Sequence, residues 1–240
     1  MDRKDKRVAT LATVPARVRS LCTTLRTLRP QVDEIYVFLN GHKEVPECLA
    51  EFDCKHVFAS EHGDKGDAGK FFWSDQLGAA WNLTCDDDFA YHPGYVDYLV
   101  DAAERLQAVV SLHGVVLAQT IAMGQPVSWL RQARKQVSYA ADDVLEDVPV
   151  HILGTGVCCH HTSLVTAAWS AFPQPHSADV YFSMVCQKKR VRRFVAAHPP
   201  DLATATAPPL SVGPKKLRWN GVYSQRVADQ APWILHTEYP

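Results

Sequence analysis

The chain has 240 residues, 47% of them hydrophobic, and a formal net charge of −1. This length and composition can bury a substantial core, and the balanced charge lacks the basic excess of a nucleic-acid-binding protein. The seven cysteines are scattered and form no C-x-x-C pair, so we expect reduced thiols rather than a zinc or redox motif. The charged start, Met1 to Arg7, predicts no signal peptide, and no apolar run approaches the roughly 20 residues of a membrane span.

The first half of the chain alternates strand-like and helix-like segments. Glu34 to Leu39 is a nearly continuous run of β-branched and aromatic residues, typical of a strand buried on both faces of a parallel sheet. From Ala16 to Leu28 apolar residues recur at helical spacing until Pro30 stops the pattern. Such alternation favours an α/β fold with right-handed crossovers. We expect strands at 8–13, 34–39, 55–59 and 83–85, and helices at 16–28, 71–77 and 95–106.

The second half is less regular. Val109 to Ala118 is strongly β-prone, and Gly114 within it indicates a bulge or a close approach. Periodicity fades between residues 120 and 147, whose aromatic and basic residues suit either a ligand-facing loop or a solvated excursion. We expect a strand at 150–158, a short helix at 164–171, a helix at 177–188, a strand at 191–196 and an irregular tail after 200.

Three consecutive carboxylates, Asp86, Asp87 and Asp88, follow the apolar run Leu83 to Cys85. Acids at the end of a buried strand repel one another and resist desolvation, so folding alone would not select them there. A divalent cation would relieve this cost, because hard cations take carboxylate oxygens as ligands. On these residues alone, a solvated acidic turn is an equal alternative.

Two glycine-containing segments could approach a ligand closely. Glu61 to Lys70 is a charged loop whose amides and lysine could hold a phosphate, although a plain surface loop explains the pattern equally well. Gly154 and Gly156 interrupt the strand predicted at 150–158 and would let its backbone come near a ligand.

Four of these segments occur in a definite order. Ala9 to Arg17 and Asp33 to Asn40 open the chain, Cys85 to Asp88 follows, then Ala178-Asp179, and His198 comes after the last predicted strand. Together they resemble the inverting glycosyltransferases of the GT-A fold, in the family-two-like group that includes capsule and exopolysaccharide transferases. The acid triplet is similar to the D-x-D motif of that group. The resemblance spans most of the chain and implies a Rossmann-like α/β fold with a mixed, mostly parallel sheet flanked by helices.

The resemblance also implies roles for single residues. Mn²⁺ or Mg²⁺ would be held by Asp86 and Asp88 with His198 as third ligand, and Asp87 could replace either acid. Asp179 would be the catalytic base, although a first-turn acid also suits the helix dipole and position 178 lacks the acid of many relatives. His198 is otherwise explained as a residue that ends a strand. Contacts to the nucleotide sugar are expected from Thr13, Pro15, Arg17, Asn40, Asp64, Asp67, Lys70, Asp86, Asp87, Gly154, Thr155 and Gly156.

The function implied is inverting transfer of a sugar from a nucleoside-diphosphate sugar, expected to be a UDP-sugar, to a glycan, a lipid-linked glycan or another hydroxyl acceptor. We expect one domain over 1–240, with a donor half at 1–118, an acceptor half at 119–200 and a tail or lid at 201–240. Lys215, Lys216 and Trp219 would close that lid, unless the tail is disordered. The expected location is cytoplasmic, free or peripheral to the inner face of the membrane, and a place in a larger glycan-assembly protein is compatible with it. The competing classes are a metal-dependent phosphohydrolase or nucleotidyltransferase, and a non-catalytic nucleotide- or carbohydrate-binding domain.

Overall fold

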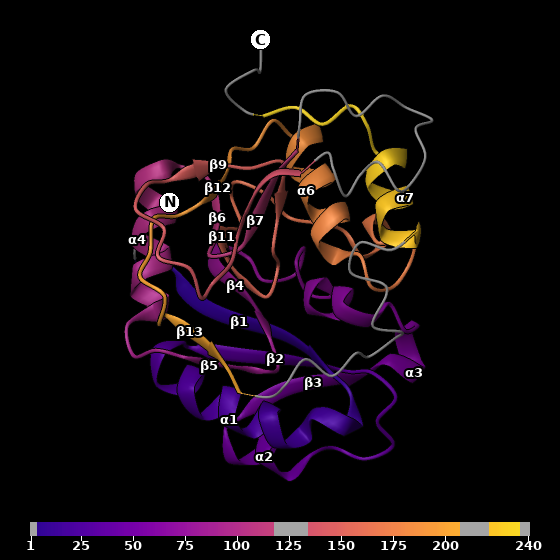
Figure 1. The fold of residues 1–240 in the computed structure, drawn as a ribbon. Helices are drawn as coiled ribbons and strands as arrows, with labels where there is room; N and C mark the ends of the chain where they lie inside the picture. Colours follow the sequence, from indigo (N-terminus) through magenta and orange to yellow (C-terminus); the bar gives the residue numbers. More distant parts are fainter. Residues whose placement is uncertain (1–3, 118–133, 207–220, 236–240) are drawn as a thin grey trace.

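An eight-stranded sheet forms the centre of the computed structural model, which describes residues 4–117, 134–206 and 221–235 (Figure 1). The strand order is β3-β2-β1-β4-β11-β6-β12-β9, and all strands run parallel except β11 and β9. This mixed, mostly parallel sheet confirms the α/β class expected from the sequence. The strands are β1 (Lys6–Thr13), β2 (Glu34–Leu39), β3 (Cys54–Phe58), β4 (Ala80–Asp86), β6 (Val109–Ser111), β9 (Val148–Pro149), β11 (Val157–His161) and β12 (Arg193–Val195).

The order of the strands reverses at β1. From β1 the chain moves outward to β2 and β3, and it then crosses back to β4 on the other side of β1. In register, Ala12 of β1 lies opposite Asp86 of β4, and Thr13 lies opposite Leu39 of β2. The carboxyl ends of these three strands therefore meet where crossovers leave in opposite directions, which is the place where open α/β sheets bind ligands.

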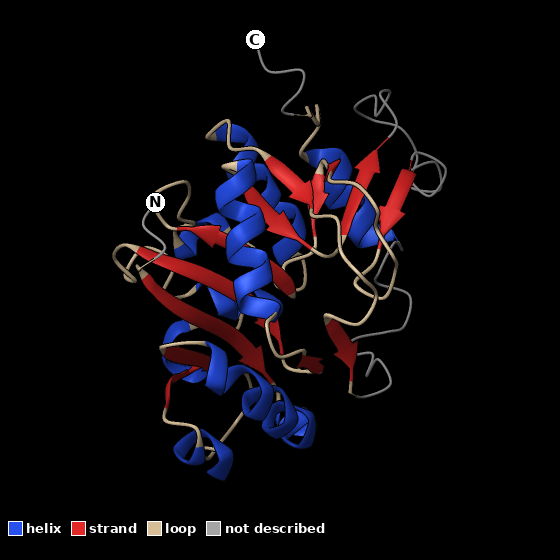
Figure 2. Ribbon diagram, turned by 90° about the vertical axis from the view of Figure 1, so that its left-hand side faces the viewer, coloured by secondary structure: helices blue, strands red, loops and turns tan. Residues whose placement is uncertain are grey.

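Helices flank the sheet, as Figures 1 and 2 show. The helices at 18–28 and 95–106 are amphipathic, with buried apolar side chains along one face, and the helix predicted at 95–106 has the bounds of α4. The α-helices are α1 (Val18–Leu28), α2 (Glu47–Glu51), α3 (Ala59–His62), α4 (Tyr95–Leu106), α6 (Ala178–Lys188) and α7 (Gly221–Asp229), and the 3-10 segments are η1 (Pro15–Arg17), η2 (Arg29–Gln31), η3 (Gly66–Phe71) and η4 (Trp169–Ala171).

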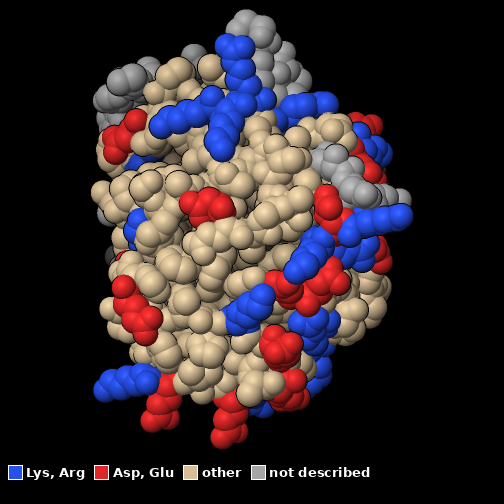
Figure 3. Space-filling view, turned by 180° about the vertical axis from the view of Figure 1, so that it is seen from behind, with Lys and Arg blue, Asp and Glu red and all other residues tan. Residues whose placement is uncertain are grey.

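The described surface carries mixed charge. Over the lower right of the face seen in Figure 3, Lys and Arg side chains lie beside Asp and Glu side chains. Exposed ion pairs of this type join Lys6 and Lys55 to Glu34, and Arg7 to Asp97. In the described ranges, no helix combines the length and the apolar character needed to cross a membrane.

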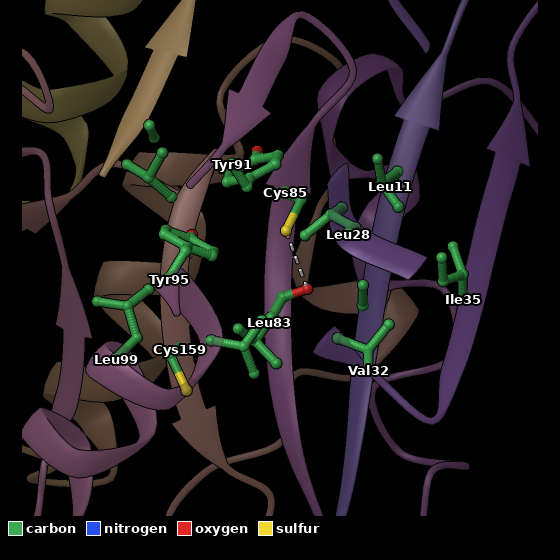
Figure 4. Packing of buried hydrophobic residues seen from close by; sticks show 14 of the residues in the cluster. Leu11, Leu28, Val32, Ile35, Leu83, Cys85, Tyr91, Tyr95, Leu99 and Cys159 are labelled. Atoms are coloured by element: carbon green, nitrogen blue, oxygen red, sulfur yellow. Dashed lines mark hydrogen bonds between the residues drawn. The ribbon is translucent and has the colours of Figure 1, made fainter. Parts of the chain in front are cut away.

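Two clusters of buried side chains hold the helices against the sheet. On one face, Leu11 and Leu83 belong to the cluster that packs against α1 and α4 (Figure 4). On the other face, Phe182 of α6 belongs to a cluster with Cys158 of β11. Because side chains alternate along a strand, Asp86, three residues after Leu83, points to the α6 face.

Several predicted strands and helices are wrong in detail. The β-prone run at 109–118 divides into β6 and β7 (Gly114–Leu117), and the one at 150–158 divides into β10 (Ile152–Leu153) and the start of β11. β10, β7 and β8 (Arg134–Ser138) form a second sheet. No α-helix forms at 71–77 or 164–171, where the chain makes turns and η4. The tail is not wholly irregular, because β13 (Ala203–Ala205) pairs with β5 (Phe89–Tyr91) and α7 follows.

Candidate active site at the carboxyl ends of β1 and β4

The acid triplet lies beside the end of β1. Asp86 is the last residue of β4, and Asp87 and Asp88 form the turn that leads to β5. Thr13 ends β1, and Asn40, which follows β2, donates its N–H to the carbonyl of Thr13 at 2.9 Å. The structure thus brings together predicted site residues that are far apart in the sequence.

Two basic side chains bind the three acids. Lys70 donates to Oδ1 of Asp86, and Nη1 of Arg17 lies 2.9 Å from Oδ1 of Asp87 and 2.5 Å from Oδ2 of Asp88. The side chains of Lys70 and Asp87 are only 2% and 6% exposed, whereas that of Asp86 is 38% exposed. The cluster is therefore anchored inside the protein by ion pairs and opens to solvent at Asp86.

Burial dominates the electrostatics of the acids. It raises the pKa of Asp87 to about 6, against the lowering influence of Thr13 and Arg17. It also raises the pKa of Asp88, and repulsion from Asp86 acts in the same direction. Burial alone would lower the pKa of Lys70, but attraction to the carboxylates outweighs it and raises that pKa. Additional positive charge at this place would favour the ionised acids.

A tyrosine and a glycine fix Asp86. Its N–H lies 3.0 Å from the carbonyl of Gly156 and 2.9 Å from the hydroxyl of Tyr91, and that hydroxyl donates to the same carbonyl at 2.8 Å. A Cβ built on Gly156 would lie under 3.0 Å from the Asp86 carboxylate, so only glycine fits without movement. This role of Tyr91 could not be predicted from the sequence, because its hydrogen bond to Gly156 joins two segments that are remote in the chain.

The glycine-rich loop reaches into the site at its end. Asp67 accepts the N–H of Ala178, the first residue of α6, at 3.3 Å through Oδ2, and its Oδ1 is buried with no hydrogen-bond partner in the described residues. Burial raises the pKa of Asp67 to about 6, with Lys70 opposing and Asp179 and Asp86 adding to the shift. Asp67 and Lys70 thus connect the acids to α6, which a plain surface loop would not do.

The predicted base, Asp179, is held by the loop before β11. Its Oδ1 accepts both the N–H of Thr155 at 2.8 Å and the hydroxyl of Thr155 at 2.6 Å. The carbonyl of Thr155 lies 3.5 Å from Nζ of Lys70. Gly154, Thr155 and Gly156 therefore join Asp179 on one side to Lys70 and Asp86 on the other.

Three predicted nucleotide contacts line the margin of the site. Pro15 and Asp64 are exposed, and Oδ1 of Asp64 accepts the N–H of Gly66 at 2.7 Å. Nδ2 of Asn40 donates to the carbonyl of Gly66 at 3.0 Å, and Oδ1 of Asn40 is buried without a hydrogen-bond partner in the described part of the chain. Arg17 binds Asp87 and Asp88, and its expected contact with the nucleotide stays a prediction. Lys215, Lys216 and Trp219 lie outside the described residues.

His198 is not placed as a free ligand. It is buried, with Nε2 3.2 Å from the carbonyl of Leu112 and Nδ1 2.9 Å from the carbonyl of Pro199. Across the described ranges, no three His, Cys, Asp or Glu side chains form a group that could hold a metal ion. A third-ligand role for His198 stays a prediction, and it requires one ring nitrogen to leave its carbonyl, because the other can keep its hydrogen bond.

The acids nevertheless suit a cation that takes few ligands from the protein. Mg²⁺ is commonly held by one or two carboxylates together with phosphate oxygens and water. Asp86, Asp87 and Asp88 supply such oxygens, and the unpartnered Oδ1 of Asp67 adds a further negative atom nearby. The donor set therefore fits Mg²⁺ or Mn²⁺ accompanied by a diphosphate.

An aromatic pair borders the other side of the Gly154 loop. The rings of His113 and Tyr139 lie 4.8 Å apart, and Tyr139 is 46% exposed. Gly154 donates its N–H to the carbonyl of His113 at 2.7 Å. His113 could not be selected from the sequence, because this contact depends on how the segments around β7 fold together.

Solved structures match this chain along most of its length. Glucosyl-3-phosphoglycerate synthase from Mycobacterium tuberculosis, in complex with Mn²⁺, uridine diphosphate and phosphoglyceric acid, has a TM-score of 0.52 at 13% identity, covering 95% of this chain and 77% of that one. The same protein with Mg²⁺ and uridine diphosphate gives 0.51 at 14% identity, with 95% and 78% covered. The fold is GT-A-like. At such identities the likeness shows the fold alone.

A nucleotidyl transferase from Methanothermobacter aligns at a TM-score of 0.48 with 15% identity, covering 81% of this chain and 88% of that one. No family model and no curated protein matches the sequence.

Proposed function

We propose that this protein is a glycosyltransferase that uses a nucleoside-diphosphate sugar and Mn²⁺ or Mg²⁺, and that it transfers the sugar to a hydroxyl acceptor with inversion. The observation that carries the proposal is the concentration of Asp86, Asp87 and Asp88 at the switch point of the sheet, linked through Lys70 and Thr155 to Asp179. The neighbours solved with uridine diphosphate and Mg²⁺ or Mn²⁺ share this fold and support the donor and cation classes.

In this proposal the acids anchor the donor. Asp88 and Asp86 would hold the cation, which when bound would neutralise the charge that develops on the leaving diphosphate. Lys70 would stay on Asp86 and keep the carboxylate oriented, because its ammonium is buried. Thr13 and Asn40 would face the nucleotide with Pro15 and Asp64 at its margin, and UDP is the nucleotide that we favour.

Asp179 would act as the base. Its Oδ1 is taken by Thr155, and among the described residues Oδ2 makes no hydrogen bond, which leaves that atom for the acceptor hydroxyl. The acceptor oxygen would form a bond to the anomeric carbon as the bond from that carbon to the diphosphate breaks. The hydroxyl proton would pass to Oδ2, and the diphosphate would leave with its electron pair. A positioned base of this type contributes about 10²- to 10⁴-fold to the rate.

The wider arrangement belongs to the same proposal. The donor would occupy the half formed by 1–118, and the acceptor, a glycan or lipid-linked glycan, would approach from the half formed by 119–200. We also propose a place in capsule or exopolysaccharide assembly and a position in the cytoplasm or at the inner membrane face, on the ground of the sequence resemblance alone.

A thermal-shift screen of UDP, GDP and their sugar conjugates, each with and without Mn²⁺, tests the central claim. A nucleotide at 100 times its Kd should add about 2.7 kcal/mol of stability, which is roughly 5–10 °C for a domain of this size. The shift should require both nucleotide and Mn²⁺. A protein that no nucleoside diphosphate stabilises in a metal-dependent way would contradict the proposal.

Two variants separate the roles of the acids. Asp88→Asn should lose the metal-linked shift, whereas Asp179→Asn should keep it and lose at least 10²-fold in transfer rate, because an amide oxygen still accepts from Thr155 but cannot take a proton. Asp75→Asn, an exposed acid outside the site, is the control. Equal loss of nucleotide binding in both variants would remove Asp179 from the base role, and nucleotide binding without turnover would indicate a binding domain.

A further inference from the structure

Arg17 binds Asp88, one of the two carboxylates that the proposed function assigns to the cation, and it also binds the neighbouring Asp87. A single nitrogen, Nη1, lies 2.9 Å from Asp87 and 2.5 Å from Asp88. All three side chains are mostly buried, with 15%, 6% and 15% exposure. A cation and this guanidinium nitrogen cannot both contact Oδ2 of Asp88 at the same time, because two positive groups would then lie against one oxygen.

The two basic residues of the site are held differently. Lys70 is inside the protein, on η3, and its ammonium also lies near the carbonyl of Thr155. Arg17 is the last residue of η1, a short 3-10 segment whose Pro15 and Ala16 are exposed. The Arg17 side chain is 15% exposed against 2% for Lys70, and it follows an exposed backbone segment, so it can change its rotamer with less displacement of its neighbours. Arg17 is therefore the one of the two whose side chain can be displaced.

We propose that Arg17 is an exchangeable counter-ion: without substrate it neutralises Asp87 and Asp88, and it moves to the diphosphate when a divalent cation takes its place. This inference rests on the proposed function and concerns the regulation of the same site. The acids exchange one positive charge for two, and the released guanidinium gains a phosphate partner, to which Arg binds in a bidentate manner.

The exchange makes cation and nucleotide binding cooperative. A divalent cation that arrives alone must displace Arg17 without offering it a new partner, so it binds weakly. A cation that arrives with a nucleoside diphosphate provides both the replacement charge and the new partner. By linkage, each ligand then raises the affinity for the other by the same factor, and such factors are typically 5- to 150-fold.

The test measures Mn²⁺ binding by electron paramagnetic resonance, without and with saturating UDP, in the wild-type protein and in Arg17→Gln. We expect Arg17→Gln to bind Mn²⁺ alone about tenfold more tightly than the wild type, and its UDP-induced gain to fall several-fold. Arg19→Gln removes the same charge from an exposed position two residues away and is the matched control. It should behave like the wild type.

The coupling factor, rather than the affinity, decides between exchange and simple repulsion. If Arg17 only repelled the cation from a fixed position, Mn²⁺ would bind Arg17→Gln more tightly with and without UDP, and the coupling factor would match that of the wild type. That result, or unchanged or weaker binding of Mn²⁺ alone, overturns the exchange. If Mn²⁺ did not promote UDP binding in the wild type or in Arg19→Gln, that result would instead contradict the proposed function.

Folding of the variants is checked separately. Arg17→Lys keeps the positive charge as a compact ammonium. It still tests the proposal if Arg17→Gln fails to fold. It should retain wild-type weak binding of Mn²⁺ alone and lose part of the coupling, because an ammonium makes a poorer diphosphate contact. The exchange would also be overturned if Arg17→Lys bound Mn²⁺ alone more tightly than the wild type and kept the wild-type coupling factor between Mn²⁺ and UDP.

Discussion

At the scale of single residues, three adjacent aspartates have three different surroundings. Asp86 ends a central strand and points to the α6 face, where Lys70 and Gly156 meet it. Asp87 and Asp88 follow in the turn and share Arg17. The same chemical group thus gains distinct properties from the position at which the strand ends.

Gly156→Ala tests how closely Asp86 must be held. The new methyl group would lie under 3.0 Å from the carboxylate, and such overpacking typically costs about 1–3 kcal/mol. We expect a lower Tm together with at least a tenfold weaker metal-linked affinity for UDP, measured by calorimetry.

Gly154→Ala is the control for that change. Its methyl group would meet Cβ of His113 at 2.7 Å instead of the Asp86 carboxylate. It should cost similar stability and leave UDP affinity nearer to the wild-type value. If the two variants weakened UDP binding equally, contact with Asp86 would not be the reason.

At the scale of elements, η3 and α6 act as one unit. Phe71 at the end of η3 stacks on Phe172 with centroids 4.8 Å apart and packs on Phe182 of α6 at 4.6 Å. In the same η3, Asp67 accepts the N–H of Ala178 at the start of α6. Lys70 and Asp179 are therefore positioned by a shared apolar core as well as by hydrogen bonds.

Phe71→Ala should disturb both elements together. Removing a fully buried phenylalanine typically costs about 3–5 kcal/mol, which denaturant unfolding would measure. Lys70, which holds Asp86, directly precedes Phe71 in the chain, so metal-linked UDP binding should weaken as well. Phe72→Ala, at a half-buried neighbour that packs on Phe38 rather than on α6, is the control and should spare UDP binding. If both variants lost UDP binding equally, the η3–α6 contact would not be the reason for the weaker binding in Phe71→Ala.

At the scale of the whole molecule, the net charge is close to zero, but acidic side chains outnumber basic ones at the candidate site. The net charge is −1, and the half-buried acid Glu34 is paired with two exposed lysines, Lys6 and Lys55. At the switch point, however, Asp67, Asp86, Asp87, Asp88 and Asp179 face Lys70 and Arg17. Such a site attracts cations and disfavours a bare diphosphate, which agrees with the metal dependence that we propose.

This charge imbalance predicts that Asp67→Asn stabilises the protein by an amount that depends on pH. The folded pKa of Asp67, about 6, is above its ordinary value of 3.8, so the folded state binds more protons than the unfolded state between these values. Ionised Asp67 therefore lowers stability above pH 6, and this penalty disappears as the pH falls through 6 towards 4. We expect Asp67→Asn to raise Tm by a few degrees at pH 7.5, on the order of 1–3 kcal/mol, and hardly at all at pH 4.5.

Asp64→Asn is the matched control, because Asp64 is an exposed acid in the same loop. Asp64→Asn should show no pH-dependent rise in Tm when it is measured at the same two pH values. A gain in Asp67→Asn of equal size at both pH values would mean that burial of the ionised carboxylate is not the cause.

How far the sequence predicts this molecule depends on how local each feature is. Apolar periodicity identified α4 with its bounds and the strands β1 and β2, because these segments bury one continuous face or both faces. It could not show that 109–118 divides between two sheets, since a β-prone run does not reveal which strands it will pair with. Partners remote in the chain were also hidden: the sequence suggests His198 as a ligand, but the carbonyl of Leu112 contacts its ring.

The reversed direction of β11 between β4 and β6 has a consequence for hydrogen exchange. The amides of Asp86 and Thr155 are each bonded inside the sheet region, to Gly156 and Tyr91 and to Asp179, so they should exchange slowly. The backbone around Asp64 is exposed, so its amides should exchange faster, because local opening is easier there. The reacting end of the donor would thus rest on slowly exchanging backbone, whereas the nucleotide margin at Asp64 lies on backbone that opens more readily. Changes of nucleotide preference should then be tolerated without loss of catalytic geometry.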